Sequence, residues 1–220
     1  MPVNRKGSDQ MARGTYQEKR KQKIALILET AKRIFAEKGF SGARTDEIAK
    51  KAGISKMSMY YYVGNKKDLY SSVLQELLVY SEKYASQKVD LSSSPRENLT
   101  RIIKGIAEVA DKESDLHAIL LRELVSGGEN IPKELPNTLG KTISLIDAVL
   151  KDGKKQHIFQ DVDPFLFFFT AMGLFVYWKL HLPILNKIDS DSSLIENSGG
   201  QIPDKLVNKF EELIFKMISI

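Results

Sequence analysis

Hydroxyl and ammonium side chains are concentrated in one short segment of the chain. Residues 55–66 read Ser-Lys-Met-Ser-Met-Tyr-Tyr-Tyr-Val-Gly-Asn-Lys. If residues 56–62 form a helix, these side chains cannot all face a protein core, because neighbouring residues point in different directions. Ammonium, phenol and serine groups can bond phosphate oxygens and base edges in the major groove of DNA. The segment therefore indicates nucleic-acid binding.

Two short helices must hold this segment in place. Thr45 is suited to cap the first helix and Ser55 the second, because a hydroxyl can accept a hydrogen bond from a free N–H of the first turn. Gly53 lies between them, where a sharp turn often needs a positive φ. Ala49 is small enough for a second helix to cross close by, and Ile54 fills the angle between the helices. This spacing is that of a helix-turn-helix.

A third helix should begin directly after the segment. Asn65 is suited to cap it, with Asp68 at the third helical position in a box-like arrangement. Lys66 and Lys67 then occupy the first turn, where positive charge is unfavourable for the helix dipole. A nearby phosphate would remove that penalty, because helix N-termini also bind anions.

The run from Thr45 to Leu69 resembles the DNA-binding signature of the TetR family of transcriptional regulators. It reads Thr-x-x-Ile-Ala-x-x-Ala-Gly-Ile-Ser-x-x-Ser-x-Tyr-Tyr-Tyr-x-x-Asn-Lys-x-x-Leu. The resemblance implies an all-α protein of about nine helices, with an N-terminal three-helix DNA-binding head and a larger C-terminal domain for ligand binding and dimerisation. Met57 stands where the family often has a small residue, and Val63 where it often has an aromatic one. The operator therefore cannot be taken from relatives.

The resemblance also implies which residues meet DNA. Tyr61 and Lys66 are expected to contact phosphates, while Lys56, Met57 and Tyr62 are expected nearer the base edges. The competing interpretation is a helical hairpin whose tyrosines pack in a core. The full set of expected DNA-binding residues is Thr45, Ser55, Lys56, Met57, Ser58, Tyr60, Tyr61, Tyr62 and Lys66.

Composition limits the remaining possibilities. The chain has 220 residues, a formal net charge of +5 and no cysteine, so disulfides and Cys-type zinc sites are excluded. Residues 1–70 contain 16 Lys and Arg against 7 Asp and Glu, whereas the rest contain 17 against 21. We therefore expect only the N-terminal third to meet a polyanion.

Catalytic patterns are missing from the sequence. His117, His157 and His181 do not have the spacing of metal ligands, and no Gly-rich phosphate loop, nucleophile elbow or paired carboxylates occur. We therefore expect no enzyme activity, no cofactor and no metal. Because no basic-then-apolar leader precedes a small-residue cleavage site, a cytoplasmic location is expected.

We expect three parts along the chain. Residues 1–21 are polar and basic and should form a flexible arm, residues 22–68 the helix-turn-helix domain, and residues 69–220 the effector-binding and dimerisation domain. The arm either follows the phosphate backbone or enters the minor groove of DNA, or it is simply a solvated tail. Both interpretations stay open.

The most apolar stretch of the sequence runs from residue 165 to 182. A helix that is apolar all round must be buried on all sides, and a second copy of the chain could cover the side that its own core leaves open. The family resemblance implies a homodimer through this helix and the last one, near 204–218, with burial inside a single chain as the alternative. The stretch is near the lower limit for a membrane span, but Lys179, His181 and Pro183 should end it.

The resemblance further implies a small-molecule effector inside the C-terminal domain. The expectation is a homodimeric repressor that a mostly apolar effector releases from a palindromic, double-stranded operator without membrane contact. An activator, a constitutive DNA binder or a membrane-associated helical protein remain the alternatives, and plain core packing is the alternative for the pocket. Its candidate residues are Tyr84, His117, Phe168, Met172, Phe175 and Trp178.

Overall fold

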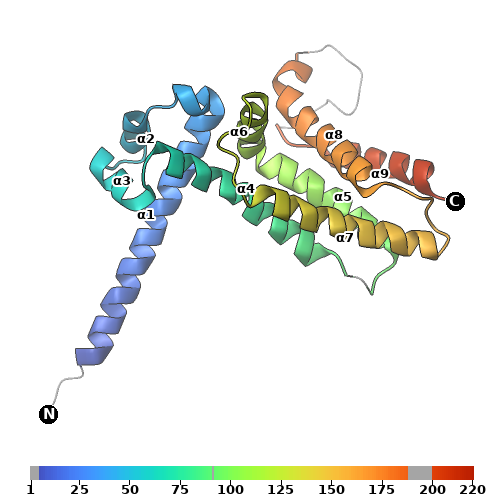
Figure 1. Ribbon diagram of the computed structural model, residues 1–220, viewed down its shortest axis with the longest axis horizontal. Coiled ribbons are helices and arrows are strands. Elements are labelled where there is room, and N and C mark those ends of the chain that lie inside the picture. Colours follow the sequence, from blue (N-terminus) through green and yellow to red (C-terminus); the bar gives the residue numbers. More distant parts are fainter. Residues whose placement is uncertain (1–4, 91, 188–199) are drawn as a thin grey trace. The chain divides into compact units, whose positions relative to one another are not determined.

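The computed structural model describes residues 5–90, 92–187 and 200–220, which form nine α-helices (Figure 1). In these ranges the only strand-like pairing is an isolated bridge between Phe159 and Ser219. The chain folds into two compact units. The first, which we call the head unit, extends to Gln75 and includes Ile119–Ile131. The second, the C-terminal unit, comprises Glu76–Ala118 and Pro132–Ile220.

The head unit is built on three helices and the start of a fourth. They are α1 (Arg5–Gly42), α2 (Thr45–Lys51), α3 (Lys56–Val63) and α4 (Lys66–Lys88). Aromatic rings fill the space between α1 and α4, since the Tyr70 ring lies edge-on to Phe35 at 4.8 Å and to Phe40 at 5.0 Å between centroids. The buried core of this unit includes Ile27, Ala31, Ile34, Phe35, Ile48, Ala49, Met59, Leu69, Tyr70 and Val73.

The first helix begins much earlier than expected. We expected an arm without regular structure over residues 1–21, but residues 5–21 are helical, and residues 1–4 lie outside the described part of the chain. The side chains from Thr15 to Lys19 are exposed. A helix without a buried face needs no apolar residues at helical spacing, so the sequence pattern did not reveal it. Gly39 interrupts the helix with φ 68° and ψ 177°, a backbone conformation that glycine adopts without strain.

The head unit also takes in the end of α6 (Ser114–Val125), which we had assigned to the C-terminal domain. Glu123 is only 4% exposed, and its Oε2 accepts a hydrogen bond from the Tyr70 hydroxyl at 3.1 Å. Its Oε1 accepts from the Asn130 backbone N–H at 2.7 Å and from the Asn130 side chain at 3.0 Å. Burial and then the bond to Glu123 raise the pKa of Tyr70. A buried carboxylate needs such partners, and here they attach α6 to α4.

The C-terminal unit is a bundle around α5 (Pro95–Lys112), which contacts α7 (Leu135–Lys155), α8 (Pro164–Leu185) and α9 (Asp204–Ile218). A capping box starts α5, since Ser94 Oγ accepts from the Glu97 N–H and the Glu97 carboxylate accepts from the Ser94 N–H. Pro183 lies inside α8, which ends at Leu185, so the expected helix end at residue 182 is wrong by three residues.

We expect Tyr70→Phe to lower the free energy of unfolding by about 1–3 kcal/mol, because a buried carboxylate oxygen loses its donor. Urea denaturation followed by circular dichroism measures this. A double-mutant cycle with Glu123→Gln separates the pair from general packing, and coupling below about 0.5 kcal/mol would show that the bond contributes little.

Candidate nucleic-acid interface and effector region

The turn between α2 and α3 has the geometry that the sequence predicted. Gly53 has a φ of 67°, and the Ile54 N–H donates to the carbonyl of Ala49 at 3.0 Å. Ser55 caps α3, since its Oγ accepts from the Ser58 N–H at 3.1 Å. This cap and this glycine were both predicted from residue type alone.

The predicted cap at Thr45 is wrong. Arg44 occupies the N-cap position of α2 and makes no side-chain cap bond. Thr45 is the first helical residue, and its Oγ1 lies 3.1 Å from the hydroxyl of Tyr60. The threonine hydroxyl therefore joins α2 to α3, because a tertiary partner is available that the local sequence does not show.

The third helix exposes a mixed apolar and phenolic surface. Met59 is fully buried and fixes the helix to the core, whereas Met57 is 83% exposed and Tyr61 is 69% exposed. Tyr60 is also exposed. Ser58 is half-buried, with its Oγ 2.8 Å from that of Ser55, so it faces the cap.

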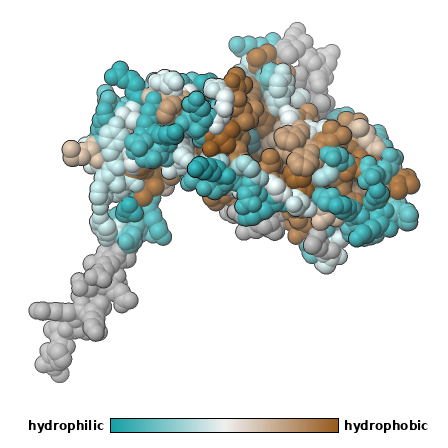
Figure 2. All heavy atoms as spheres, viewed as in Figure 1, coloured by the Kyte–Doolittle hydropathy of each residue, from teal (hydrophilic) through white to brown (hydrophobic). Residues whose placement is uncertain are grey.

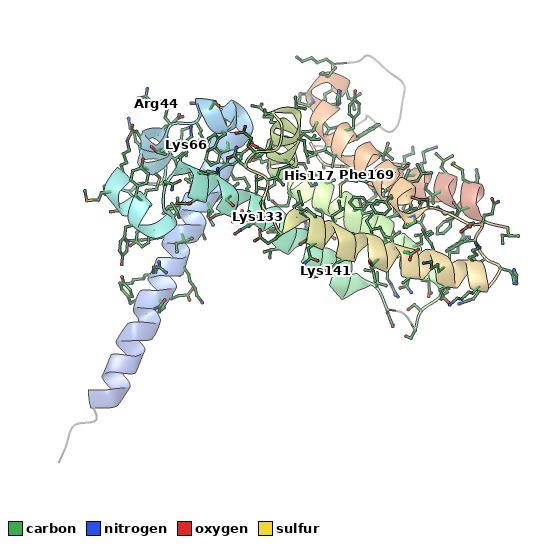
Figure 3. The ribbon with its side chains drawn as sticks, viewed as in Figure 1. Arg44, Lys66, His117, Lys133, Lys141 and Phe169 are labelled. Carbon is green, nitrogen blue, oxygen red and sulfur yellow. The ribbon has the colours of Figure 1, made fainter. Side chains whose placement is uncertain are left out.

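Lys56 is paired in the free protein. Its Nζ lies 2.8 Å from Asp46 Oδ1, and this hydrogen bond raises the pKa of Lys56 and lowers the pKa of Asp46. Both side chains are about half exposed, so the pair contributes little to stability and DNA can replace it. The charge of Arg44, labelled in Figure 3, helps to lower the pKa of Asp46 and slightly opposes the rise in the pKa of Lys56. Arg44 was not among the residues predicted to bind DNA. The only feature of the sequence that pointed to Arg44 was its position directly before the run that starts at Thr45.

Lys66 lies at the start of α4. Its Nζ is 4.7 Å from the centroid of the Phe40 ring and 3.4 Å from the carbonyl oxygen of Ser41. The predicted cap is confirmed, because Asn65 Oδ1 accepts from the N–H groups of Lys67 and Asp68 at 2.8 and 3.1 Å. Two N–H groups of the first turn are thus occupied, so a phosphate here would bond the Lys66 ammonium rather than the helix end.

The predicted effector residues fall into three groups. Phe168 and Phe175 are buried in the core of the C-terminal unit with the partly buried Met172 and Trp178, and the Phe175 ring packs edge-on to Phe210 at 5.3 Å. His117 is buried on α6, where Nδ1 lies 2.9 Å from the carbonyl oxygen of Glu113 and desolvation lowers its pKa. The side chain of Tyr84 lies outside the described residues.

Trp178 differs from the other aromatic residues of this core. Its indole Nε1 is buried without a hydrogen-bond partner among the described residues. An unpartnered buried donor costs free energy, and one explanation is an acceptor supplied by a bound molecule.

Apolar side chains remain at the surface of the C-terminal unit (Figure 2). By length and composition α8 is the one described helix that could cross a membrane, although a third of its apolar window is buried in the unit. No metal-binding group of three His, Asp or Glu residues occurs among the described residues. The exposed apolar residues of α8 and α9 are Phe165, Leu166, Phe169, Tyr177, Ile184, Leu213 and Met217.

Comparison with known proteins agrees with this geometry. The family model described as bacterial regulatory proteins, tetR family, matches residues 27–73 of the chain. An HTH-type transcriptional repressor of Streptomyces coelicolor is 31% identical over 170 residues, which are 74% of this chain and 81% of that protein. The negative regulator IcaR of the icaADBC biofilm operon in Staphylococcus epidermidis is 26% identical over 88% of this chain and 96% of its own.

Solved structures share the fold. The ketosteroid transcriptional regulator KstR2 of Mycobacterium tuberculosis has a TM-score of 0.68 at 17% identity, over 90% of this chain and 95% of that one. A regulator from Saccharomonospora viridis in complex with choline has a TM-score of 0.62 at 20% identity, over 91% and 99%.

The helix-turn-helix and these relatives define a DNA-binding transcriptional regulator. The chain belongs to the TetR family, and the all-α fold expected from the sequence is confirmed. Regulators of this family bind DNA, dimerise and bind small-molecule effectors, and the relatives are regulators rather than enzymes.

We expect Lys66→Ala and Lys56→Ala to affect DNA binding differently. Lys66→Ala should weaken binding to all sequences and reduce the salt slope by about one unit per head, because a phosphate contact is lost. Lys56→Ala should change the preferred bases by about 1–3 kcal/mol at the contacted position. Binding titrations at several salt concentrations and a selection from random DNA measure both.

Lys104→Ala, an exposed lysine of the C-terminal unit, is the matched control and should change neither property. Equal salt slopes and equal base preferences for the Lys56 and Lys66 variants would contradict the division of roles.

Proposed function

We propose that the protein is a homodimeric repressor that binds a palindromic operator and leaves it when an apolar effector occupies the C-terminal unit. The observation that carries the proposal is the surface of α3, which leaves Met57 and Tyr61 exposed while Met59 anchors the helix. An exposed methionine and an exposed tyrosine on the same short helix as Lys56 suit a DNA groove.

The residues of this surface divide by their position. Tyr61 and Lys66 contact phosphates, with Thr45 and Ser55 as weaker partners, whereas Lys56, Met57 and Tyr62 lie at the base edges. Tyr60 and Ser58 support them, because their hydroxyls already bond within the head. Phosphate contacts set affinity and register, and base contacts set the sequence that is read.

The dimer is supported by the exposed apolar face of α8. Leu166, Phe169 and Tyr177 are separated by three and eight residues, which places them on one side of the helix. Thr170 and Gly173 lie on this side as well, and a Cβ at Gly173 would meet nothing within 4 Å. In an isologous two-fold interface the same surface of both copies meets, so α8 of a second copy can pack closely against α8 at Gly173.

A membrane is the less favoured cover for this face. The Lys179 ammonium lies 2.6 Å from Asp111 Oδ1 on α5, with both side chains mostly buried. This ion pair and the buried rings of Phe167 and Phe175 fix α8 in the protein core. A helix held in this way has one face left for a partner protein. We therefore propose that the protein is cytoplasmic.

The effector is proposed to contact Trp178. Its unpartnered N–H can donate to an acceptor on the effector, and Phe168 and Met172 of the same core cluster are apolar, so we propose a mostly apolar effector with one hydrogen-bond acceptor. Relatives of the same fold include regulators named for ketosteroids and for fatty acid degradation. Both classes are largely hydrocarbon compounds with few polar groups.

Coupling between effector and DNA is proposed to run through α4 and α6, because each is one continuous helix with residues in both units. The two heads of a dimer fit one face of DNA only when their α3 helices, which we call the recognition helices, are about 34–36 Å apart. The effector releases DNA if it binds more tightly to the arrangement of heads that does not fit the operator. Equal affinity for both arrangements would not change their populations.

A mobility-shift assay with DNA from upstream of the protein's own gene tests the proposal. Binding that an apolar compound abolishes is expected. Binding that no compound changes would indicate a constitutive DNA binder, and transcription that rises with the protein would indicate an activator.

We expect Phe169→Glu and Leu213→Glu to produce monomers that no longer bind the operator, because a charge on the interface must be desolvated or expel the partner. Analytical ultracentrifugation of the 24.8 kDa chain measures the change. Val125→Glu, on an exposed residue of α6 in the head unit, is the control and should remain dimeric. A wild-type monomer at micromolar concentration would exclude the dimer.

We expect an effector that releases DNA to change the fluorescence of Trp178, the single tryptophan. Trp178→Phe keeps an aromatic ring but removes the donor, and should weaken effector binding about fivefold or more. Met172→Ala should also weaken it, while Met172→Leu, which keeps the volume, serves as control. Unchanged fluorescence together with tolerance of these substitutions would place the pocket elsewhere.

A further inference from the structure

A basic groove lies between the N-terminal part of α1 and the recognition helix. It has a volume of about 310 Å³ and is open to solvent. Three cationic side chains and two phenols line it, and no carboxylate does. Its lining residues are Tyr16, Lys19, Arg20, Gln22, Lys23, Leu26 and Tyr62.

Aromatic contacts hold the two walls of this groove together. The Tyr16 side chain interacts with that of Tyr61, and this interaction is the main reason that the pKa of Tyr16 is raised. The Tyr61 ring lies edge-on to Tyr62 at 5.4 Å, and Lys23 Nζ is 5.7 Å from the centroid of the Tyr62 ring. The extension of α1 is therefore attached to the same two tyrosines that are proposed to meet DNA.

The cations of this groove differ from several other cations of the head, which are paired with carboxylates. Elsewhere Glu29 pairs with Lys32 and Arg33, and Glu47 pairs with Lys38 and Lys51. Among the described residues no ion pair is formed by the cations of the groove, which are Lys19, Arg20 and Lys23. Three cations without carboxylates, next to phenol donors, are complementary to a row of phosphates.

We infer that the helical extension of α1 binds the sugar–phosphate backbone beside the half-site that α3 reads, through Lys19, Arg20 and Lys23. This inference rests on the proposed DNA-binding function and extends it to a second surface. Residues 5–22 span about 27 Å at 1.5 Å per residue, so the extension can reach beyond the half-site.

The helical form of the extension decides between the two ways in which a basic N-terminus can bind DNA. A helix with its side chains is about 10–12 Å wide, whereas the minor groove of B-DNA is only about 6 Å wide. The extension therefore cannot enter the minor groove as an extended arm does. It contacts phosphates and adds affinity without reading bases.

The test compares the full chain with a triple variant, Lys19→Gln/Arg20→Gln/Lys23→Gln. Loss of three phosphate contacts should reduce the slope of log K against log salt by about 2.7 per head, with the base preference unchanged. Hydroxyl-radical footprinting should show backbone protection outside the half-site with the wild type and not with the variant. Tyr16→Phe should loosen the extension, with a smaller loss of affinity than the triple variant.

The control variant is Lys104→Gln/Lys133→Gln/Lys155→Gln, which removes the same charge from exposed positions of the C-terminal unit and should keep the wild-type slope and footprint. If the head variant, folded by circular dichroism, retains both wild-type properties, the extension is a solvated helix and the inference is wrong. A changed base preference with an unchanged slope would also overturn it. If the wild type binds no DNA, the proposed function itself fails.

Discussion

A helix of eight residues is too short to be stable in water, so α3 depends on the rest of the head. Met59 supplies its one fully buried anchor, Ser55 caps its first turn, and Gly64 ends it with a φ of 74°. The bond between Thr45 and Tyr60 ties it to α2. These attachments leave the side chains of Met57 and Tyr61 exposed, so they can meet DNA in the proposed complex.

The head is in turn completed by a segment from far along the chain. Glu123 is buried, and a buried carboxylate is tolerated only when its oxygens are hydrogen-bonded. Tyr70 and Asn130 provide three donors to it, which holds α6 and the following loop against α4. Breaking one of these bonds leaves a charge unsatisfied, so the attachment is specific in position even if its net contribution to stability is small.

Features set by local chemistry could be predicted from the sequence, and those set by distant partners could not. Gly53, Ser55 and Asn65 act within three residues of themselves, and each has the predicted role. Tyr60 lies 15 residues from its partner Thr45, and Tyr70 lies 53 residues from its partner Glu123, and no periodicity reveals these pairs. The predicted effector residues on α8 could not be told apart from the sequence either. Helical spacing does not show that Phe175 packs on Phe210, or that the indole N–H of Trp178 has no partner among the described residues.

Carboxylates within the head determine what each cation can do on DNA. Glu29 and Glu47 neutralise lysines and arginines away from α3, whereas Asp46 pairs with Lys56 on the recognition helix itself. In the proposed complex Lys56 leaves Asp46 for a base, so it exchanges one partner for another and little net affinity is gained. A wrong base would leave both Lys56 and Asp46 worse paired than before. This favours discrimination over affinity at Lys56. In the proposed complex, affinity then comes from cations without such a competitor, which in the described part of the head include Lys19, Arg20 and Lys23 beside α3 and Lys66 at the start of α4.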